Sequence, residues 1–237
     1  MDRLSGSGLR AFCQACLRPV GLAALFMIPV FAWICVSASG SEDPSRLPAE
    51  VSLWTLESAE QILWKSPWVR EGRFRFFNSR RRIRQITYYV RLQSALPVRL
   101  AMAKAYLSQP EANVIDVGGT DPEELEELSK QFRLPDEVVF AVIISPQFIH
   151  RRLNGYSFEA LAESSYLELR DKKIRLKEFV PPEKTTFGEA WFRFPRPELD
   201  SSSGNIRFVT SLKVPYQISV KADFDPSDME FMGRLEY

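Results

Sequence analysis

The stretch Glu137-Val-Val-Phe-Ala-Val-Ile-Ile144 is apolar at every position after its first, so an extended chain presents apolar side chains on both of its faces. Strands that are covered on both sides carry such continuous apolar runs, whereas half-exposed strands alternate between apolar and polar residues. We therefore expect residues 137–144 to form a central strand of a sheet that is covered on both sides.

Three short helices are expected before this strand. The first follows Thr55, whose hydroxyl can accept a hydrogen bond from a free backbone amide, and ends at Ser66 because the proline after it disfavours helical geometry. The second has Ser94 as its expected cap and covers residues 96–107, with an apolar stripe along one side. The third follows Asp121 and has proline in its first position.

Strands are expected on both sides of the central one. Residues 86–93 alternate between apolar and polar side chains, and so do residues 216–224 and 229–237, which flank a four-residue turn. Alternation indicates one buried face, and a short turn between two such segments predicts an antiparallel hairpin. Residues 166–170 and 174–180 predict another hairpin. The fold class predicted is α+β, with about three short helices and a mainly antiparallel sheet that ends in a C-terminal β-hairpin.

The first 40 residues are expected to be an export signal. Three arginines precede an uncharged apolar run at residues 20–36, and small residues follow the run up to Gly40. Basic residues before such a run stay in the cytoplasm, so everything after it would be exported. The seventeen residues of the run lie between the usual length of a signal peptide and that of a spanning helix. Both a cleaved signal peptide and a retained signal anchor therefore remain open for residues 1–40.

The remaining chain is expected to contain a linker and one domain. Residues 41–53 begin with a polar, proline-containing stretch typical of a linker, and residues 54–237 form the predicted domain. Cys13, Cys16 and Cys35 all precede the linker, so the exported part has no cysteine and is disulfide-free. That composition suits a periplasmic or surface domain that is large enough to be stabilised by its core.

Charge is unevenly distributed along the chain, although the formal net charge is only +1. Residues 41–110 carry a net charge of +6 and residues 111–237 a net charge of −7. Much of the basic excess is one arginine cluster, which we expect on a solvated strand or loop, with contact to anionic lipid headgroups or another polyanion as the alternative. Nucleic acid is not an expected partner of an exported protein. The cluster consists of Arg70, Arg73, Arg75, Arg80, Arg81, Arg82 and Arg84.

Candidate catalytic, cofactor-binding and metal-binding residues are few. His150 is the single histidine, and the exported part has no cysteine, which excludes a cysteine nucleophile and a zinc site rich in these residues. Residues 115–119 resemble the glycine-rich loop of many methyltransferases but lack its third glycine, so no cofactor is expected. The acidic residues at 223–230 lack the glycine and spacing of a calcium loop, so no metal is expected. We predict no catalytic residues.

Trp54, Trp64 and Trp68 lie close together in the sequence. Such a group can be a sugar-stacking platform or a membrane-interface belt, but large aromatic rings more often attach a helix to a core. We expect the second arrangement.

Four short strings resemble a group of exported bacterial proteins of unknown function. They are Ser66-Pro67-Trp68, Ser94-Ala-Leu-Pro-Val-Arg99 with Ala101, Phe192-Arg-Phe-Pro-Arg196 and Met229-Glu-Phe-Met-Gly-Arg-Leu-Glu-Tyr237. The resemblance extends over most of residues 54–237 and implies export and a shared domain. It implies no activity and no site residues.

These observations predict an exported envelope protein, periplasmic or membrane-anchored, whose non-catalytic domain binds an envelope protein partner or supports an assembly. Contact with the membrane would be through the N-terminal segment if it is not cleaved. One alternative is a carboxylate-dependent hydrolase of an envelope polymer, which needs a cleft with two carboxylates about 5–9.5 Å apart. The other is a polyanion or lipid-surface binder, which needs the arginine cluster on one exposed face.

Overall fold

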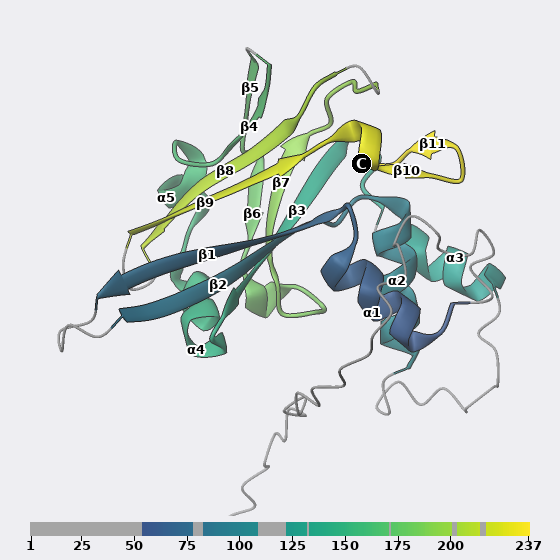
Figure 1. Cartoon of the computed structure of the whole chain (residues 1–237), viewed down its shortest axis with the longest axis horizontal. Coiled ribbons are helices and arrows are strands. Elements are labelled where there is room, and N and C mark those ends of the chain that lie inside the picture. Colours follow the sequence, from purple (N-terminus) through teal and green to yellow (C-terminus); the bar gives the residue numbers. More distant parts are fainter. Residues whose placement is uncertain are drawn as a thin grey trace, which may run out of the picture. The chain divides into compact units, whose positions relative to one another are not determined.

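Strand β3 (Glu137–Ser145) lies in the middle of a five-stranded antiparallel sheet in the computed structural model, as its apolar run predicts (Figure 1). The strand order is β1-β2-β3-β7-β6. The other members are β1 (Val69–Phe77), β2 (Ile83–Leu92), β6 (Glu178–Val180) and β7 (Ala190–Pro195). The structure describes residues 54–77, 83–108, 122–131, 133–170, 172–200, 203–213 and 217–237.

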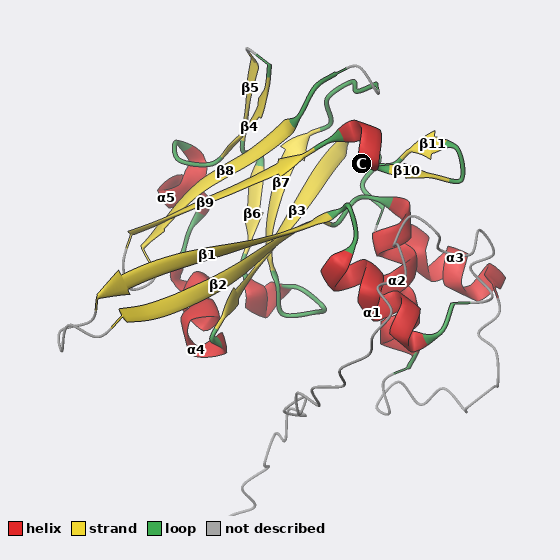
Figure 2. Ribbon diagram, viewed as in Figure 1, coloured by secondary structure: helices red, strands yellow, loops and turns green. Residues whose placement is uncertain are grey.

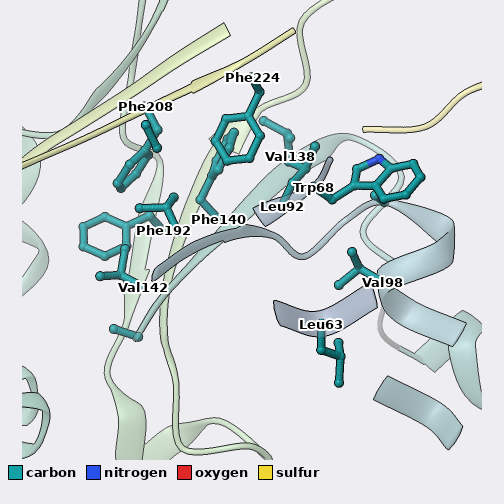
Figure 3. Packing of buried hydrophobic residues seen from close by; sticks show 14 of the residues in the cluster. Leu63, Trp68, Leu92, Val98, Val138, Phe140, Val142, Phe192, Phe208 and Phe224 are labelled. Atoms are coloured by element: carbon teal, nitrogen blue, oxygen red, sulfur yellow. The ribbon is translucent and has the colours of Figure 1, made fainter. Parts of the chain in front are cut away.

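A second antiparallel sheet packs against the first through phenylalanine rings. The ring of Phe140 on β3 stacks on Phe208 at a centroid distance of 5.2 Å and lies 5.4 Å from Phe224. Phe192 of β7 meets the same Phe208 edge-on at 5.3 Å (Figure 3). The second sheet has the order β5-β4-β8-β9 and consists of β4 (Tyr166–Leu169), β5 (Lys172–Arg175), β8 (Ile206–Lys213) and β9 (Gln217–Phe224).

Three helices lie together beside one end of the five-stranded sheet (Figures 1 and 2). They are α1 (Leu56–Lys65), α2 (Leu96–Leu107) and α3 (Pro122–Gln131). They confirm the three helices predicted from the sequence. Thr55 caps α1 by accepting a hydrogen bond from the Ser58 amide, as predicted. Ser94 does not cap α2, because its hydroxyl accepts a hydrogen bond from the Val139 amide of the neighbouring strand instead.

Two shorter helices follow β3 in the chain and precede β4. They are α4 (Gln147–His150) and α5 (Phe158–Ala162). Ser157 caps α5 by accepting a hydrogen bond from the Ala160 amide. With these helices and its antiparallel sheets, the described chain confirms the predicted α+β class.

The predicted pairing of the last two strands is wrong. β9 pairs along its whole length with β8, from Ile206 opposite Phe224 to Lys213 opposite Gln217. Alternation sets which side chains a strand buries, but it does not choose the neighbouring strand. The described chain still ends in a hairpin, a small one between β10 (Glu230–Phe231) and β11 (Arg234–Leu235), in which Gly233 supplies a positive φ of 72°.

Two further strands differ from the sequence prediction. The segment predicted as one strand at residues 174–180 is divided between β5 and β6, which belong to different sheets. Part of the arginine cluster, which was expected on a solvated strand or loop, lies on strand β1, where Phe74 and Phe76 alternate with Arg73 and Arg75. β1 pairs with β2 over nine residue pairs.

The predicted signal or anchor at residues 1–40 and the linker at residues 41–53 lie outside the described residues. Within the described part of the chain, none of the helices is both long and apolar enough to cross a membrane.

The aromatic contact between the sheets yields a stability prediction. Phe140 is fully buried, whereas Phe148 is 67% exposed. Phe140→Ala removes the ring that touches both sheets and is expected to lower the free energy of unfolding by about 3–5 kcal/mol. Phe148→Ala removes the same atoms from the surface and is expected to change it by less than about 0.5 kcal/mol. Urea denaturation measures both; equal midpoints for the two variants would contradict the packing described.

Candidate functional site

A cavity of about 600 Å³ lies between α2, α3, the segment that leads into β3, the residue after β7 and the C-terminal residues 234–237. Its lining is rich in cationic side chains, and we call it the basic pocket. The charged residues of its lining are Arg99, Lys130, Arg133, Arg196, Arg234, Glu126 and Glu236. Five cations against two carboxylates give the lining an excess of positive charge.

Arg99 is the buried cation of the basic pocket, with only 7% of its surface exposed. Its Nε donates to the main-chain oxygen of Ser94 at 3.1 Å, and its Nη1 donates to that of Ser129 at 2.9 Å. These two hydrogen bonds fix the guanidinium between α2 and α3. Both acceptors are neutral carbonyls, so they hold the side chain in place and leave its charge unneutralised.

Arg196 follows directly after β7 and is held by the C-terminal residue. Its Nη1 donates to the main-chain oxygen of Tyr237 at 2.7 Å, and its guanidinium lies 5.1 Å from the centre of the Tyr237 ring. The Tyr237 hydroxyl in turn donates to the Pro197 carbonyl. The Nε atom of Arg196 is buried and has no hydrogen-bond partner among the described residues. A buried donor without a partner is costly, so a movement of the Arg196 side chain that gives this atom an acceptor would be favourable.

Glu236 supplies the inner carboxylate of the basic pocket. Its Oε2 accepts a hydrogen bond from the Leu96 amide at 3.2 Å, which places a negative charge at the N-terminus of α2. Its main-chain oxygen accepts from Trp68 Nε1 at 2.8 Å. The C-terminal segment is therefore fastened to the core and forms a fixed wall of the pocket.

The charges of the pocket act on one another. Burial lowers the pKa of Arg99, Glu236 opposes this shift, and Arg133 and Arg196 add to it. An arginine remains charged in spite of such a shift. The positive charges of Arg133 and Arg196 therefore disfavour the charge of Arg99, and the Glu236 carboxylate favours it.

Lys130 contributes little to this excess. Its ammonium lies 3.2 Å from the Glu127 carboxylate and 3.8 Å from that of Glu126, all on the exposed side of α3. The hydrogen bond and charge of Glu127, followed by the charge of Glu126, raise the pKa of Lys130. The lysine is neutralised at the rim, whereas the hydrogen-bond acceptors of the buried Arg99 are uncharged.

The arginine cluster predicted from the sequence lies elsewhere, on β1 and β2. Arg70 turns inward: its Nε donates to the Asp223 carbonyl at 2.7 Å, and its guanidinium lies over the Phe224 ring. Arg73 is exposed and pairs with Glu71 at 2.7 Å.

Arg75 and Arg84 are also exposed. Arg75 lies opposite Gln85, and Arg84 lies opposite Phe76, so the two arginines point to opposite faces of the hairpin. Arg80, Arg81 and Arg82 lie outside the described residues. The described members thus do not share one face, and contact with an anionic surface stays a prediction.

His150 is buried against the main chain. Its Nδ1 accepts a hydrogen bond from the Ile144 amide at 3.3 Å, and its Nε2 donates to the Gly188 carbonyl at 2.7 Å. Both ring nitrogens are therefore occupied by backbone groups. This arrangement connects the end of β3 with the loop before β7 and does not use the imidazole as a base.

Two buried carboxylates that the sequence analysis did not single out belong to ion pairs. Glu189 pairs with Arg91, whose side chain is only 2% exposed and also contacts the Leu63 carbonyl. Glu137 accepts from Lys177 at 2.6 Å and from Arg193 at 2.5 Å. Each carboxylate is neutralised by a basic partner, so removing one partner would leave an uncompensated buried charge. Their partners are far apart in the sequence, which explains why no local pattern revealed them.

The remaining sequence candidates are structural where they are described. Trp54 and Trp68 are buried, as expected for rings that attach α1 to the core, whereas Trp64 is 42% exposed and meets Tyr89 edge-on. Asp225 caps a short helical turn by accepting from the Ser227 amide at 2.9 Å. The glycine-rich residues 115–119 lie outside the described residues.

The burial of His150 predicts how stability depends on pH. Burial lowers the pKa of His150 from the ordinary value of 6.5, against smaller opposing contributions from the Gly188 hydrogen bond and the Glu189 charge. The unfolded chain therefore takes up a proton at a higher pH than the folded chain does. The contribution of the buried, neutral His150 to the free energy of unfolding is complete above pH 6.5. It decreases as the pH falls from there toward the lowered pKa of the folded protein.

Urea denaturation between pH 7.5 and 5.5 tests this dependence. The wild-type protein is expected to lose stability across that range, and His150→Gln, which cannot titrate, is expected to show a shallower slope. The slopes of the free energy of unfolding against pH are compared, and not its absolute values, because the glutamine also changes the absolute stability. Identical slopes for the two proteins would contradict the assignment.

Comparisons of the chain with protein-family models, with curated proteins and with solved structures give no significant match. The function therefore has to be inferred from the residues of the site. Among the groups described above, the basic pocket is the one that combines a cavity with charge that the fold itself leaves unneutralised.

Proposed function

We propose that this chain is an exported envelope protein whose domain binds an anionic ligand in the basic pocket, as a non-catalytic binding or assembly domain. The single observation that carries the proposal is the gathering of Arg99, Arg133 and Arg196 around one cavity with Glu236 as their inner carboxylate. Like charges brought together in a folded protein are costly, and a bound anion removes that cost.

Export is the part of the proposal that rests on the sequence. Basic residues followed by the apolar run at residues 20–36 favour secretion or anchoring, with the domain outside the cytoplasm. An envelope protein is then the expected partner, either through the ligand or through another surface of the domain.

The acidic and basic groups of the site are already engaged in hydrogen bonds and ion pairs, and this favours binding over catalysis. Glu236 is engaged with the Leu96 amide, and Glu126 is paired with Lys130. His150 is not part of the pocket lining, and its two ring nitrogens are held by the main chain. General acid–base catalysis needs a group that is available to exchange a proton with the substrate. The groups of the basic pocket are better suited to holding a charge in place.

The size of the cavity favours an organic ligand. Sites for small molecules commonly enclose about 300–1,000 Å³, and the basic pocket encloses about 600 Å³. Leu96, Pro135 and Leu235 add apolar surface to the charged lining. A molecule with an anionic group and an apolar or neutral remainder matches this mixture.

Sulfate is the simplest probe of anion binding at the basic pocket. We expect sodium sulfate to raise the melting temperature of the wild-type protein by about 2–4 °C more than that of Arg133→Gln/Arg234→Gln, at equal ionic strength. Sulfate also stabilises folded proteins in general, and the difference between proteins removes that common effect. Thermal unfolding in sulfate and in chloride gives the comparison.

The matched control is Arg73→Gln/Arg75→Gln, which removes two exposed arginines of β1. This variant is expected to respond to sulfate as the wild type does. A pocket variant that keeps the full response would contradict the proposal. A response that is lost in the β1 variant instead would favour the arginine cluster as the anion-binding surface.

A further inference from the structure

We infer that the basic pocket binds a phosphate monoester group carried by an organic molecule. This inference rests on the proposed function, because it names the chemistry of the ligand that the same pocket takes. The observations that carry it are the number of uncompensated charges, the way the arginines are held, and the mixed lining of the cavity.

The arginines of the basic pocket leave at least two positive charges in excess. Arg99, Arg133, Arg196 and Arg234 line it, against the Glu236 carboxylate and the Tyr237 main-chain oxygen that accepts from Arg196. Lys130 does not add to this number, because Glu126 and Glu127 neutralise it at the rim. A phosphate monoester carries close to two negative charges at neutral pH, whereas a carboxylate or a phosphodiester carries one. A dianion therefore complements the inner group most closely.

The arginines are also arranged to receive several oxygen atoms. Arg99 is fixed by two main-chain carbonyls, so little freedom remains for it to lose when a ligand binds. The buried Nε of Arg196 has no acceptor among the described residues. A phosphate group presents three terminal oxygens, each able to accept charge-assisted hydrogen bonds from guanidinium groups. One of them can satisfy the unpartnered Nε once the side chain turns this atom toward the cavity, because the atom is fully buried in the described conformation.

The N-terminus of α2 is not the anion site. Its Leu96 amide already donates to the Glu236 carboxylate, which belongs to the same chain. The bound phosphate would instead be held by side chains, beside a carboxylate that repels it. Because of that repulsion, a single cation would not hold the phosphate group. The arginines of the pocket are needed together to outweigh the negative charge of Glu236.

The rest of the cavity accommodates the organic part of the ligand. Leu96, Pro135, Leu235 and Tyr237 line it together with the charged groups. Two sources supply a phosphate monoester with such a remainder: a soluble phosphorylated metabolite and the headgroup of a lipid such as phosphatidic acid. Both share the chemistry proposed here, and an experiment can distinguish them.

Calorimetric titration with small probes tests the inference. Glycerol 3-phosphate is expected to bind at least about tenfold more tightly than dimethyl phosphate, which carries one charge, and than acetate. Between pH 7.5 and 5.5 its affinity is expected to fall about fourfold, because the dianionic fraction of an ester with a second pKa near 6 falls by that factor. Sulfate stays dianionic over this range, so its binding reports any titration of the charged groups that line the pocket.

Arg196→Lys is the diagnostic variant, because it keeps the positive charge and removes the Nε donor together with the planar fork. We expect it to weaken glycerol 3-phosphate binding at least about tenfold. The matched control is Arg73→Lys on β1, which is expected to bind the probe as the wild type does. The melting temperature of each variant shows whether it is folded.

Vesicles distinguish the two sources. Binding to phosphatidylcholine vesicles that contain phosphatidic acid, displaced by glycerol 3-phosphate and absent with phosphatidylcholine alone, assigns the site to a lipid headgroup. Tight binding of glycerol 3-phosphate without vesicle binding assigns it to a soluble ester. Either result supports the inference.

Two other results separate the inference from the proposed function. If sulfate still acts through the pocket arginines but glycerol 3-phosphate binds no better than dimethyl phosphate, the phosphate assignment is overturned and the proposed function stands. If the sulfate response is independent of Arg133 and Arg234, both are overturned.

Discussion

The contact of the Phe140 ring with Phe208 and Phe224 holds the two sheets of the domain together, and the rest of the structure depends on it. Phe140 is in the middle of β3, which pairs with β2 on one side and β7 on the other. The chain enters β3 from Arg133 and Pro135 and leaves β7 at Arg196, so fixing these strands also fixes one side of the basic pocket. The Trp68 hydrogen bond to Glu236 fixes the opposite wall in the same way.

The buried charged side chains of this domain have two different kinds of partner. Arg91 is paired with Glu189, and Glu137 with Arg193 and Lys177, so these charges are compensated within the fold. Arg99 is instead held by two neutral carbonyl oxygens, and Arg196 is held by the main-chain oxygen of Tyr237. Compensated pairs contribute to the specificity of the fold, whereas gathered uncompensated cations are a feature of sites that bind anions. This contrast is the physical basis for placing function at the pocket.

Much of the fold could be predicted from local sequence, because periodicity reports burial directly. The apolar run of β3, the alternation of β2 and the cap at Thr55 each have a local physical cause, and each is confirmed. Strand partners have no such local cause. β9 has the alternation that was expected for a hairpin with the last segment of the chain, yet it pairs with β8 at the edge of the second sheet. The split between β5 and β6 likewise depends on which sheet each segment reaches.

The candidate site could not be predicted from the sequence for a related reason. Arg99, Arg133, Arg196 and Glu236 come from four segments that only the packing of helices and sheets brings together. The arginine cluster of β1 and β2 was conspicuous because its members are neighbours in the chain. In the structure, Arg70 is used by the core and Arg73 by a surface ion pair. Closeness in sequence was therefore a poor guide to shared function here.

The most direct measurement is a crystal structure of the protein with glycerol 3-phosphate. The account predicts the phosphate group in the basic pocket, with its oxygens contacting the guanidinium groups of Arg99, Arg133 and Arg196. A phosphate bound at the arginines of β1 and β2, or a basic pocket that stays empty at saturating ligand, would contradict it.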